Sequence, residues 1–347
     1  MVKKNTDMAT AEKMTEERQT ILSGITPSGR LHLGNYFGAM RQHLEMQHRG
    51  DAFYFIANYH SLTALEDGEK VREFSLNIAL DYLALGLDPE KCTFFLQSDV
   101  PQVTELCWIL VNRSPVSLME KGVAYKDKVA NGFSPNTGLF IYPVLQAADI
   151  LIYDSDIVPV GADQKQNLEI CRDLAGRFNH VYGEELLKLP EPHIVEEVAV
   201  VPGIDGRKMS KSYHNTIGIF DEGKALKKQV MAIETDSAAL EDPKDPESCN
   251  VFALIKLFAD EEQREEIAGK YRAGGYGYGH AKSELLTLIN EAFAEARERR
   301  RDLETRPDDV MDILREGGLK ARERADSVME RVRSATGLIT TYRELQP

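Results

Sequence analysis

Apolar positions in the first 190 residues follow two alternating spacings. Short runs rich in β-branched and aromatic residues predict four buried strands, at Ile21–Ile25, Ala52–Ala57, Cys92–Gln97 and Ile157–Val160. Apolar residues three or four positions apart predict helices at Leu33–His48, Gly68–Gly86, Val103–Asn112, Leu139–Tyr153 and Ala162–Asn179. Strands that alternate with helices are typical of a parallel sheet covered on both faces. The pattern therefore predicts an α/β fold with a doubly wound parallel sheet.

The last third of the chain has a different pattern. Long helical repeats occupy Ala281–Leu303 and Asp308–Thr336, separated by Pro307 and ended by Gly337. We therefore expect a polar N-terminal tail at 1–19, a Rossmann-like nucleotide-binding domain at 20–215 and an all-helical domain at 216–347. Ligands of a doubly wound domain gather at the carboxyl ends of its strands, where the strand order reverses.

Composition narrows the class of protein. The 347 residues carry a net charge of −14, which counts against nonspecific binding to nucleic acid and gives no reason to expect a DNA partner. The apolar runs fall short of the roughly 20 residues that cross a bilayer, and the first residues lack the apolar core of a secretory signal. The four cysteines form no Cys-x-x-Cys pair, so we expect neither zinc nor an iron–sulfur cluster. A cytoplasmic protein without a metal site of its own is expected.

Two separated segments are suited to phosphate chemistry. The first, Thr26–Asn35, links a predicted strand to a predicted helix, and the free N–H groups at a helix N-terminus attract phosphate. The second, Arg207–Ser212, contains Lys208 and Lys211, whose ammonium groups can stabilise negative charge on a leaving pyrophosphate. Each segment alone is equally consistent with an ordinary turn or loop. The pair together indicates ATP used for adenylation.

Two further features lie between these segments. Gly161 ends a predicted strand, and Asp163 follows it at a helix start, where it either accepts from ribose hydroxyls or caps the helix. Asp149 lies on an apolar helix, where a carboxylate without a partner is costly. Its partner is either a ligand or a residue that forms a structural salt bridge.

The two segments, in this order, resemble the two signatures of class I aminoacyl-tRNA synthetases. The run Gly24–Gly29 followed by Gly34 and Asn35 is similar to the tryptophanyl subgroup, in which Asn35 replaces the second histidine of the general signature. The resemblance extends from about Thr20 to the carboxyl end. It implies activation of L-tryptophan by ATP and its transfer to tRNA(Trp), with release of AMP and diphosphate.

The resemblance also implies roles for particular residues. It implies that His32, Lys208 and Lys211 are catalytic. The implied ATP-binding residues are Thr26, Pro27, Ser28, Gly34, Asn35, Gly161, Ala162, Asp163, Val200, Lys208, Met209, Ser210, Lys211 and Ser212. The implied amino-acid-binding residues are Leu22, His60, Tyr142, Gln146, Asp149 and Gln164. In this interpretation Asp149 accepts the indole N–H, a group that can only donate, and Tyr142 and Gln164 hold the ammonium.

The same resemblance implies binding partners, but it leaves two possible amino-acid substrates, tryptophan and tyrosine. It implies a homodimer, a helical domain that reads the tRNA anticodon, and Mg²⁺ that arrives with ATP. Gln146 and Leu22 make the pocket more polar and less aromatic than in many tryptophanyl members, which raises tyrosine as an alternative substrate. The two signatures are also consistent with a nucleotidyltransferase that does not act on tRNA, or with a non-catalytic paralogue.

Overall fold

A parallel sheet forms the centre of the molecule. The computed structural model describes residues 18–130, 132, 134, 136–161, 164–194 and 200–339. Within these residues, five strands pair in the order β3-β2-β1-β4-β5, and the pairs are parallel. The strands are β1 (Thr20–Ile25), β2 (Asp51–Ile56), β3 (Cys92–Leu96), β4 (Ile157–Val160) and β5 (Glu191–Ile194). The order reverses between β1 and β4, so their carboxyl ends define the crevice expected to bind ligands.

Helices flank this sheet and continue beyond it. The first part contains α1 (Leu33–Asn35), the π-helical turn η1 (Tyr36–Met40), α2 (Arg41–Met46), α3 (Asn58–Ser61), α4 (Gly68–Ala84), the 3₁₀ turn η2 (Gln97–Asp99), α5 (Gln102–Val111), α6 (Val116–Met119), α7 (Val123–Ala130), α8 (Thr137–Leu151) and α9 (Lys165–Tyr182). The second part contains the 3₁₀ turn η4 (Lys211–Tyr213), α10 (Gly223–Met231), α11 (Asn250–Phe258), α12 (Glu261–Ala273), α13 (Tyr278–Glu304) and α14 (Pro307–Thr336). None of these helices has both the length and the apolarity that crossing a membrane requires.

The predicted fold class is confirmed, with three local corrections. The four predicted strands are present, but β5 was missed. The predicted continuous helix Leu33–His48 is wrong, because the π-helical turn η1 interrupts it and α2 ends at Met46. The helix after β4 continues to Tyr182, beyond the predicted end at Asn179, and its predicted start at Ala162 lies outside the described residues.

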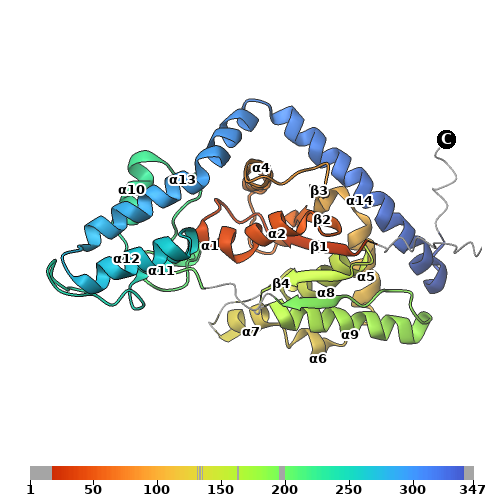
Figure 1. The fold of residues 1–347 in the computed structure, drawn as a ribbon. Helices are drawn as coiled ribbons and strands as arrows, with labels where there is room; N and C mark the ends of the chain where they lie inside the picture. The colour runs from red at the N-terminus through yellow and green to blue at the C-terminus, as the bar shows by residue number, and fades with distance from the viewer. Residues whose placement is uncertain are drawn as a thin grey trace, which may run out of the picture.

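The last helix returns to the sheet. Figure 1 shows α13 and α14 as two long helices that meet at an apex above α4, with α14 running down beside β3 and α5. Arg333 of α14 donates to Glu105 of α5, with Nε 2.8 Å from Oε1. Arg322 and Arg324 of the same helix donate to the backbone carbonyls of Asp99 and Tyr153. The domain boundaries stay a prediction.

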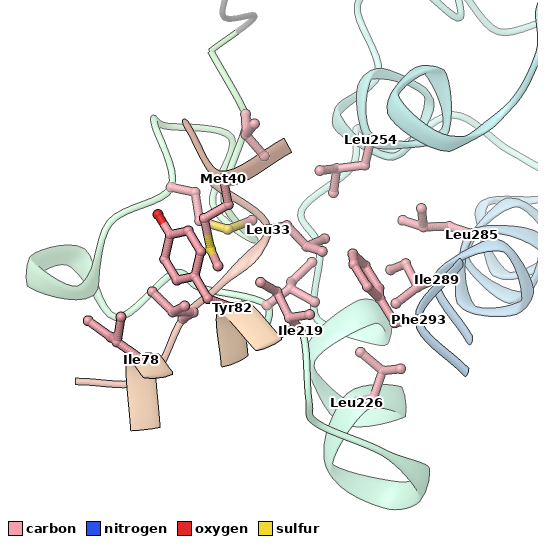
Figure 2. Close-up of a cluster of buried hydrophobic side chains, with 14 of the residues drawn as sticks. Leu33, Met40, Ile78, Tyr82, Ile219, Leu226, Leu254, Leu285, Ile289 and Phe293 are labelled. Carbon is pink, nitrogen blue, oxygen red and sulfur yellow. The ribbon is translucent and has the colours of Figure 1, made fainter. Parts of the chain in front are cut away.

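One hydrophobic cluster joins the early helices to the late ones. Leu33 and Met40 lie at the start of the first helical segment, and Tyr82 lies on α4. Figure 2 shows these side chains close to those of Ile219 and Phe293, which come from the second half of the chain. The five side chains are at most 1% exposed. The turn that carries the first signature is thus anchored in a core shared with α10, α11 and α13.

Candidate active site

Two adjoining hollows open at the carboxyl ends of β1 and β4. Their volumes are about 520 and 1020 Å³, and Gly38, Ala39 and Gly161 line both. Gly161 follows β4, while Gly38 and Ala39 belong to η1. The crevice at the reversal of strand order is therefore one continuous space with two compartments.

The first hollow contains all six residues predicted to bind the amino acid. These are Leu22, His60, Tyr142, Gln146, Asp149 and Gln164. They come from β1, α3, α8 and the turn before α9, which are far apart in the sequence. Thr26, predicted to bind ATP, also lines this hollow.

Asp149 has two hydrogen-bond donors, one inside the hollow and one outside it. Its side chain is buried on α8, at 1% exposure. Nε2 of Gln97 lies 2.8 Å from each carboxylate oxygen, and Nε2 of His60 lies 2.9 Å from Oδ2. Burial raises the pKa of Asp149, and hydrogen bonds from His60 and Gln97 oppose that rise. Asp149 therefore has protein partners, and it also lines the hollow where a ligand would bind.

Gln97 was missed by the sequence analysis. It follows the buried strand β3, where a single polar residue is consistent with an ordinary strand end. The available signal was its position at the carboxyl end of a strand, together with the predicted need of Asp149 for a partner. That signal is insufficient without the register of the sheet, because Gln97 and Asp149 are separated by 52 positions.

Tyr142 and Gln164 are linked through a third residue. Asn167, on the first turn of α9, donates from Nδ2 to Oε1 of Gln164 at 2.9 Å and to the hydroxyl of Tyr142 at 3.3 Å. Asn167 is only 6% exposed. This network holds two polar side chains at one rim of the first hollow, where oxygen atoms can accept from an ammonium group.

The aromatic wall of the hollow comes from β2. A methyl group placed on Gly24 would lie 2.4 Å from the Phe55 ring, so glycine is needed for Phe55 to cover β1. Leu22 lies on the same strand as Gly24 and is 1% exposed. The hollow therefore has an aromatic side chain even though position 22 is aliphatic.

The second hollow contains most of the residues predicted to bind ATP. They are Ser28, Gly34, Asn35, Gly161, Val200, Lys208, Met209, Ser210, Lys211 and Ser212. His32, predicted to be catalytic, lines the same hollow. Pro27 lines neither hollow, which leaves its predicted contact untested. Ala162 and Asp163 lie outside the described residues.

Lys211 joins the two signatures directly. Its Nζ donates to Oγ of Ser28 at 3.1 Å and to the carbonyl of Gly29 at 3.0 Å. Burial lowers the pKa of Lys211, while the nearby carboxylate of Asp81 acts in the opposite direction. Two segments more than 180 positions apart in sequence thus place a partly desolvated ammonium group beside the turn after β1.

His32 presents an uncharged imidazole to the second hollow. It is 6% exposed, and burial, with a smaller effect from the Lys211 charge, lowers its pKa to about 4. Its Nδ1 is buried and has no hydrogen-bond partner among the residues that the structure describes. A buried, unpaired ring nitrogen that borders a hollow fits a ligand with complementary polar atoms.

The second signature is held by a compact hairpin. Met209 is 4% exposed, and its sulfur accepts from the Gly34 N–H at 3.4 Å. Asn215, 1% exposed, donates to the Lys208 carbonyl at 3.2 Å and accepts from the Ser210 N–H at 2.8 Å. Met209 is therefore anchored under the first signature, while Lys208 stays exposed. This arrangement fixes the loop backbone and leaves its ammonium groups at the hollow.

The arrangement suits electrostatic catalysis more than covalent catalysis. Ammonium groups and the signature turn lie around one compartment, and a buried carboxylate lies in the next. In the described part of the chain, no group of three or more His, Cys, Asp or Glu residues is placed to hold a metal ion. The geometry is suited to a reaction between two ligands. One is a small molecule with a hydrogen-bond donor that the buried carboxylate can accept, and the other carries phosphate groups.

Comparisons with known proteins agree with this geometry. Residues 14–294 match the family model described as tRNA synthetases class I (W and Y). A tryptophan–tRNA ligase from Fusobacterium nucleatum is 56% identical over 318 residues, which cover 92% of this chain and 98% of that protein. The crystal structure of tryptophanyl-tRNA synthetase from Campylobacter jejuni complexed with ADP and tryptophan is 52% identical, with a TM-score of 0.87 over 92% of this chain and 100% of that chain. A tyrosyl-tRNA synthetase from Archaeoglobus fulgidus has the same fold, at 19% identity and a TM-score of 0.61 over 83% of this chain and 91% of that chain.

Proposed function

Because this chain belongs to the W and Y family of class I tRNA synthetases, we propose that it is a tryptophan–tRNA ligase. It activates L-tryptophan with ATP to tryptophanyl-adenylate and transfers the tryptophanyl group to tRNA(Trp), with release of diphosphate and AMP. The observation that carries this proposal is the position of Asp149 in one compartment and Lys211 in the adjoining one. High identity to tryptophan–tRNA ligases over nearly the whole chain supports it.

ATP occupies the larger compartment in this proposal. The unpaired Nδ1 of His32 and the ammonium groups of Lys208 and Lys211 are the groups that fit a polyphosphate. A neutral His32 contributes a hydrogen bond without adding charge. Mg²⁺ enters with the nucleotide, because this ion is commonly held by substrate phosphates and water.

Tryptophan occupies the smaller compartment. Its indole N–H donates to Asp149, and its ammonium group is held beside Tyr142 and Gln164. Gly161 lines both hollows, and in this proposal the substrate carboxylate meets ATP beside it. A side chain that cannot donate leaves unused the acceptor capacity of Asp149 that faces the hollow and is not taken by His60 and Gln97.

Activation is then a displacement at phosphorus. The substrate carboxylate attacks the α-phosphate, the bond to the β-phosphate oxygen breaks, and pyrophosphate leaves. The protein supplies orientation of the two substrates and stabilisation of the charge on the leaving group, so no side-chain nucleophile is needed. Lys211 is the group best placed for that stabilisation, because its ammonium is partly desolvated.

A second copy of the chain is the proposed partner at an apolar surface. Leu62, Trp108 and Val116 are 57%, 69% and 65% exposed, and Leu62 lines a hollow of about 350 Å³ together with Cys107 and Leu145. Large exposed apolar side chains favour a protein interface. The homodimer is tested by sedimentation of the wild type and of Trp108→Asp. A monomeric wild type at micromolar concentration contradicts it.

Transfer to tRNA involves the helical region. We assign anticodon reading to the helices after residue 216 and place the enzyme in the cytoplasm, where tRNA is charged. The net charge of −14 counts against nonspecific binding to nucleic acid, so neither assignment is based on it.

The decisive experiment compares amino acids in ATP–pyrophosphate exchange. Exchange should depend on tryptophan and exceed that with tyrosine by about 10²-fold, because a phenol fills less of the pocket than an indole and places its donor at a different position relative to Asp149. Purified tRNA(Trp) should then be charged with tryptophan. A preference for tyrosine identifies the tyrosine–tRNA ligase suggested by Gln146, and exchange without any tRNA charging identifies a nucleotidyltransferase. A protein that binds ligands without exchange is the non-catalytic paralogue.

A further inference from the structure

Gln97 directly follows β3, and its side chain contacts the carboxylate of Asp149. Its side chain is 1% exposed and belongs to η2. Its Nε2 donates to both oxygens of Asp149 at 2.8 Å, and its Oε1 accepts from the Tyr59 N–H at 2.9 Å. Because the Tyr59 N–H can only donate, it fixes which end of the amide faces Asp149. The orientation of Gln97 is therefore determined at both ends.

Two hydrogen bonds between Asn58 and Ser98 connect η2 to α3. Asn58 donates from Nδ2 to Oγ of Ser98 at 2.8 Å and accepts from the Ser98 N–H at 3.0 Å. These two hydrogen bonds hold together the segments that follow β2 and β3. His60, which donates to Asp149, also lies on α3. Gln97 and His60 thus reach Asp149 from two elements that are locked to each other.

Gln97 is not among the residues that line either compartment. An effect on the substrate must therefore pass through Asp149. A buried carboxylate held by two donors keeps one orientation, and an acceptor in one orientation discriminates better than one that can rotate or take up a proton.

We propose that Gln97 is a positioning residue that holds Asp149 in the orientation that accepts the indole N–H, and thereby sets the selectivity for tryptophan. This inference rests on the proposed function. In this inference Gln97, which lies outside the pocket, controls the selectivity that Asp149 provides inside it.

The test uses two substrates that differ in one atom. They are tryptophan and the analogue with sulfur in place of the indole nitrogen, which cannot donate to Asp149. The full-length protein is assayed for kcat and KM in ATP–pyrophosphate exchange with each. The wild type should prefer tryptophan by about 10–100-fold in kcat/KM, the range of a hydrogen bond to a charged group.

Two variants remove the contact in different ways. Gln97→Met keeps an unbranched side chain and removes both hydrogen bonds. Gln97→Glu keeps an acceptor for the Tyr59 N–H but replaces the donor that faces Asp149. Both variants should lower the preference for tryptophan by about tenfold, mainly through a higher KM for tryptophan. The analogue should be much less affected.

Gln47 provides the matched control. It is also a buried glutamine, at 4% exposure, with Nε2 donating to the Leu44 carbonyl at 2.9 Å and Oε1 accepting from the Asp88 N–H at 2.8 Å. Gln47→Met should lower thermal stability while leaving the substrate preference unchanged.

Four outcomes separate the explanations. Folded Gln97 variants that keep the wild-type preference within about twofold would overturn the inference, as would a wild type that does not distinguish the two substrates. Equal losses with both substrates would show a merely structural role. A wild type that does not activate tryptophan at all would instead overturn the proposed function.

Discussion

Lys211 is the residue at which the two halves of the proposed ATP site meet. Its ammonium group lies within hydrogen-bond distance of Ser28 and Gly29, although it has been partly removed from water. A hydroxyl and a carbonyl satisfy its donors but do not neutralise its charge. The full positive charge therefore remains available to a polyphosphate in the hollow.

Lys211→Ala should lower the rate of tryptophan activation by about 10²–10³, because a charge contact that strengthens as pyrophosphate leaves acts mainly in the transition state. Tryptophan affinity should change little, since Lys211 does not line the compartment of Asp149. Pre-steady-state adenylate formation and equilibrium binding of tryptophan measure the two quantities. Lys227→Ala, at an exposed position on α10, is the control and should behave as the wild type. An unchanged rate in Lys211→Ala contradicts the assigned role.

At the scale of elements, α14 is packed unusually close to the sheet. A methyl group on Gly317 would lie 1.9 Å from the Phe94 carbonyl oxygen, and one on Gly318 would lie 2.9 Å from Cβ of Asp99. The helix therefore approaches β3 and η2 at a distance that only glycine allows. Gln97 also belongs to η2, so α14 packs against the segment that holds the hydrogen-bond partner of Asp149.

Gly317→Ala should destabilise the protein by about 2–3 kcal/mol, because the added methyl group meets backbone that cannot move aside. Gly269→Ala, on α12, is the matched control: a methyl group there meets nothing within 4 Å. It should stabilise the protein by about 0.5–1 kcal/mol through the higher helix propensity of alanine. Urea unfolding measures both. Equal effects of the two substitutions would show that the close packing of α14 has no energetic importance.

Elements with a strong local signal were predicted, and those defined by distant contacts were not. The buried runs of β1 to β4 follow from side-chain periodicity alone. Strand β5 contains Pro192 and His193 and forms only by pairing with β4, so its sequence carries little strand signal. The π-helical turn η1 lies within a regular apolar repeat that does not distinguish it from an α-helix.

The candidate site divides in the same way. Turns with glycine, lysine and serine predicted most of the residues that line the second hollow, and a carboxylate on an apolar helix drew attention to Asp149. Gln97 escaped prediction, because its role depends on the register that places β3 next to β2. The charges of Arg300 and its neighbours alternate with acidic residues, a pattern typical of a solvated helix face, and only the packing shows that Arg300 pairs with the buried Asp81.

At the scale of the whole molecule, a buried ion pair ties the long helix α13 to the sheet domain. Arg300 donates from Nε to Oδ1 of Asp81 at 2.6 Å and from Nη2 to Oδ1 of Asn77 at 2.9 Å. The Asp81 side chain is 4% exposed. Phe74 lies on the same face of α4, one turn before Asn77, and its ring would be 3.8 Å from a methyl group on Gly29. One helix face thus contacts both the first signature turn and α13.

The pair should make stability depend on pH in a predictable direction. Burial raises the pKa of Asp81 to about 6, and the charge of Arg300 opposes that rise. A carboxyl with a raised pKa in the folded state contributes fully below its unfolded pKa, and this contribution is lost as pH rises through 6. Without Arg300 the folded pKa of Asp81 rises further, so the loss continues to higher pH.

Arg300→Gln should therefore destabilise the protein by about 3 kcal/mol at pH 8 and by clearly less at pH 5.5, where Asp81 is protonated in both proteins. The difference in the free energy of unfolding between wild type and variant, measured in urea at several pH values, should grow as pH rises above 6. Arg315→Gln is the control, because Arg315 pairs with Asp312 on the surface of α14 and its side chain is 68% exposed. It should cost less than about 0.5 kcal/mol at every pH. A pH-independent difference for Arg300→Gln would mean that Asp81 does not change its protonation when its partner is removed, and that the link between α13 and α4 depends on packing and neutral hydrogen bonds.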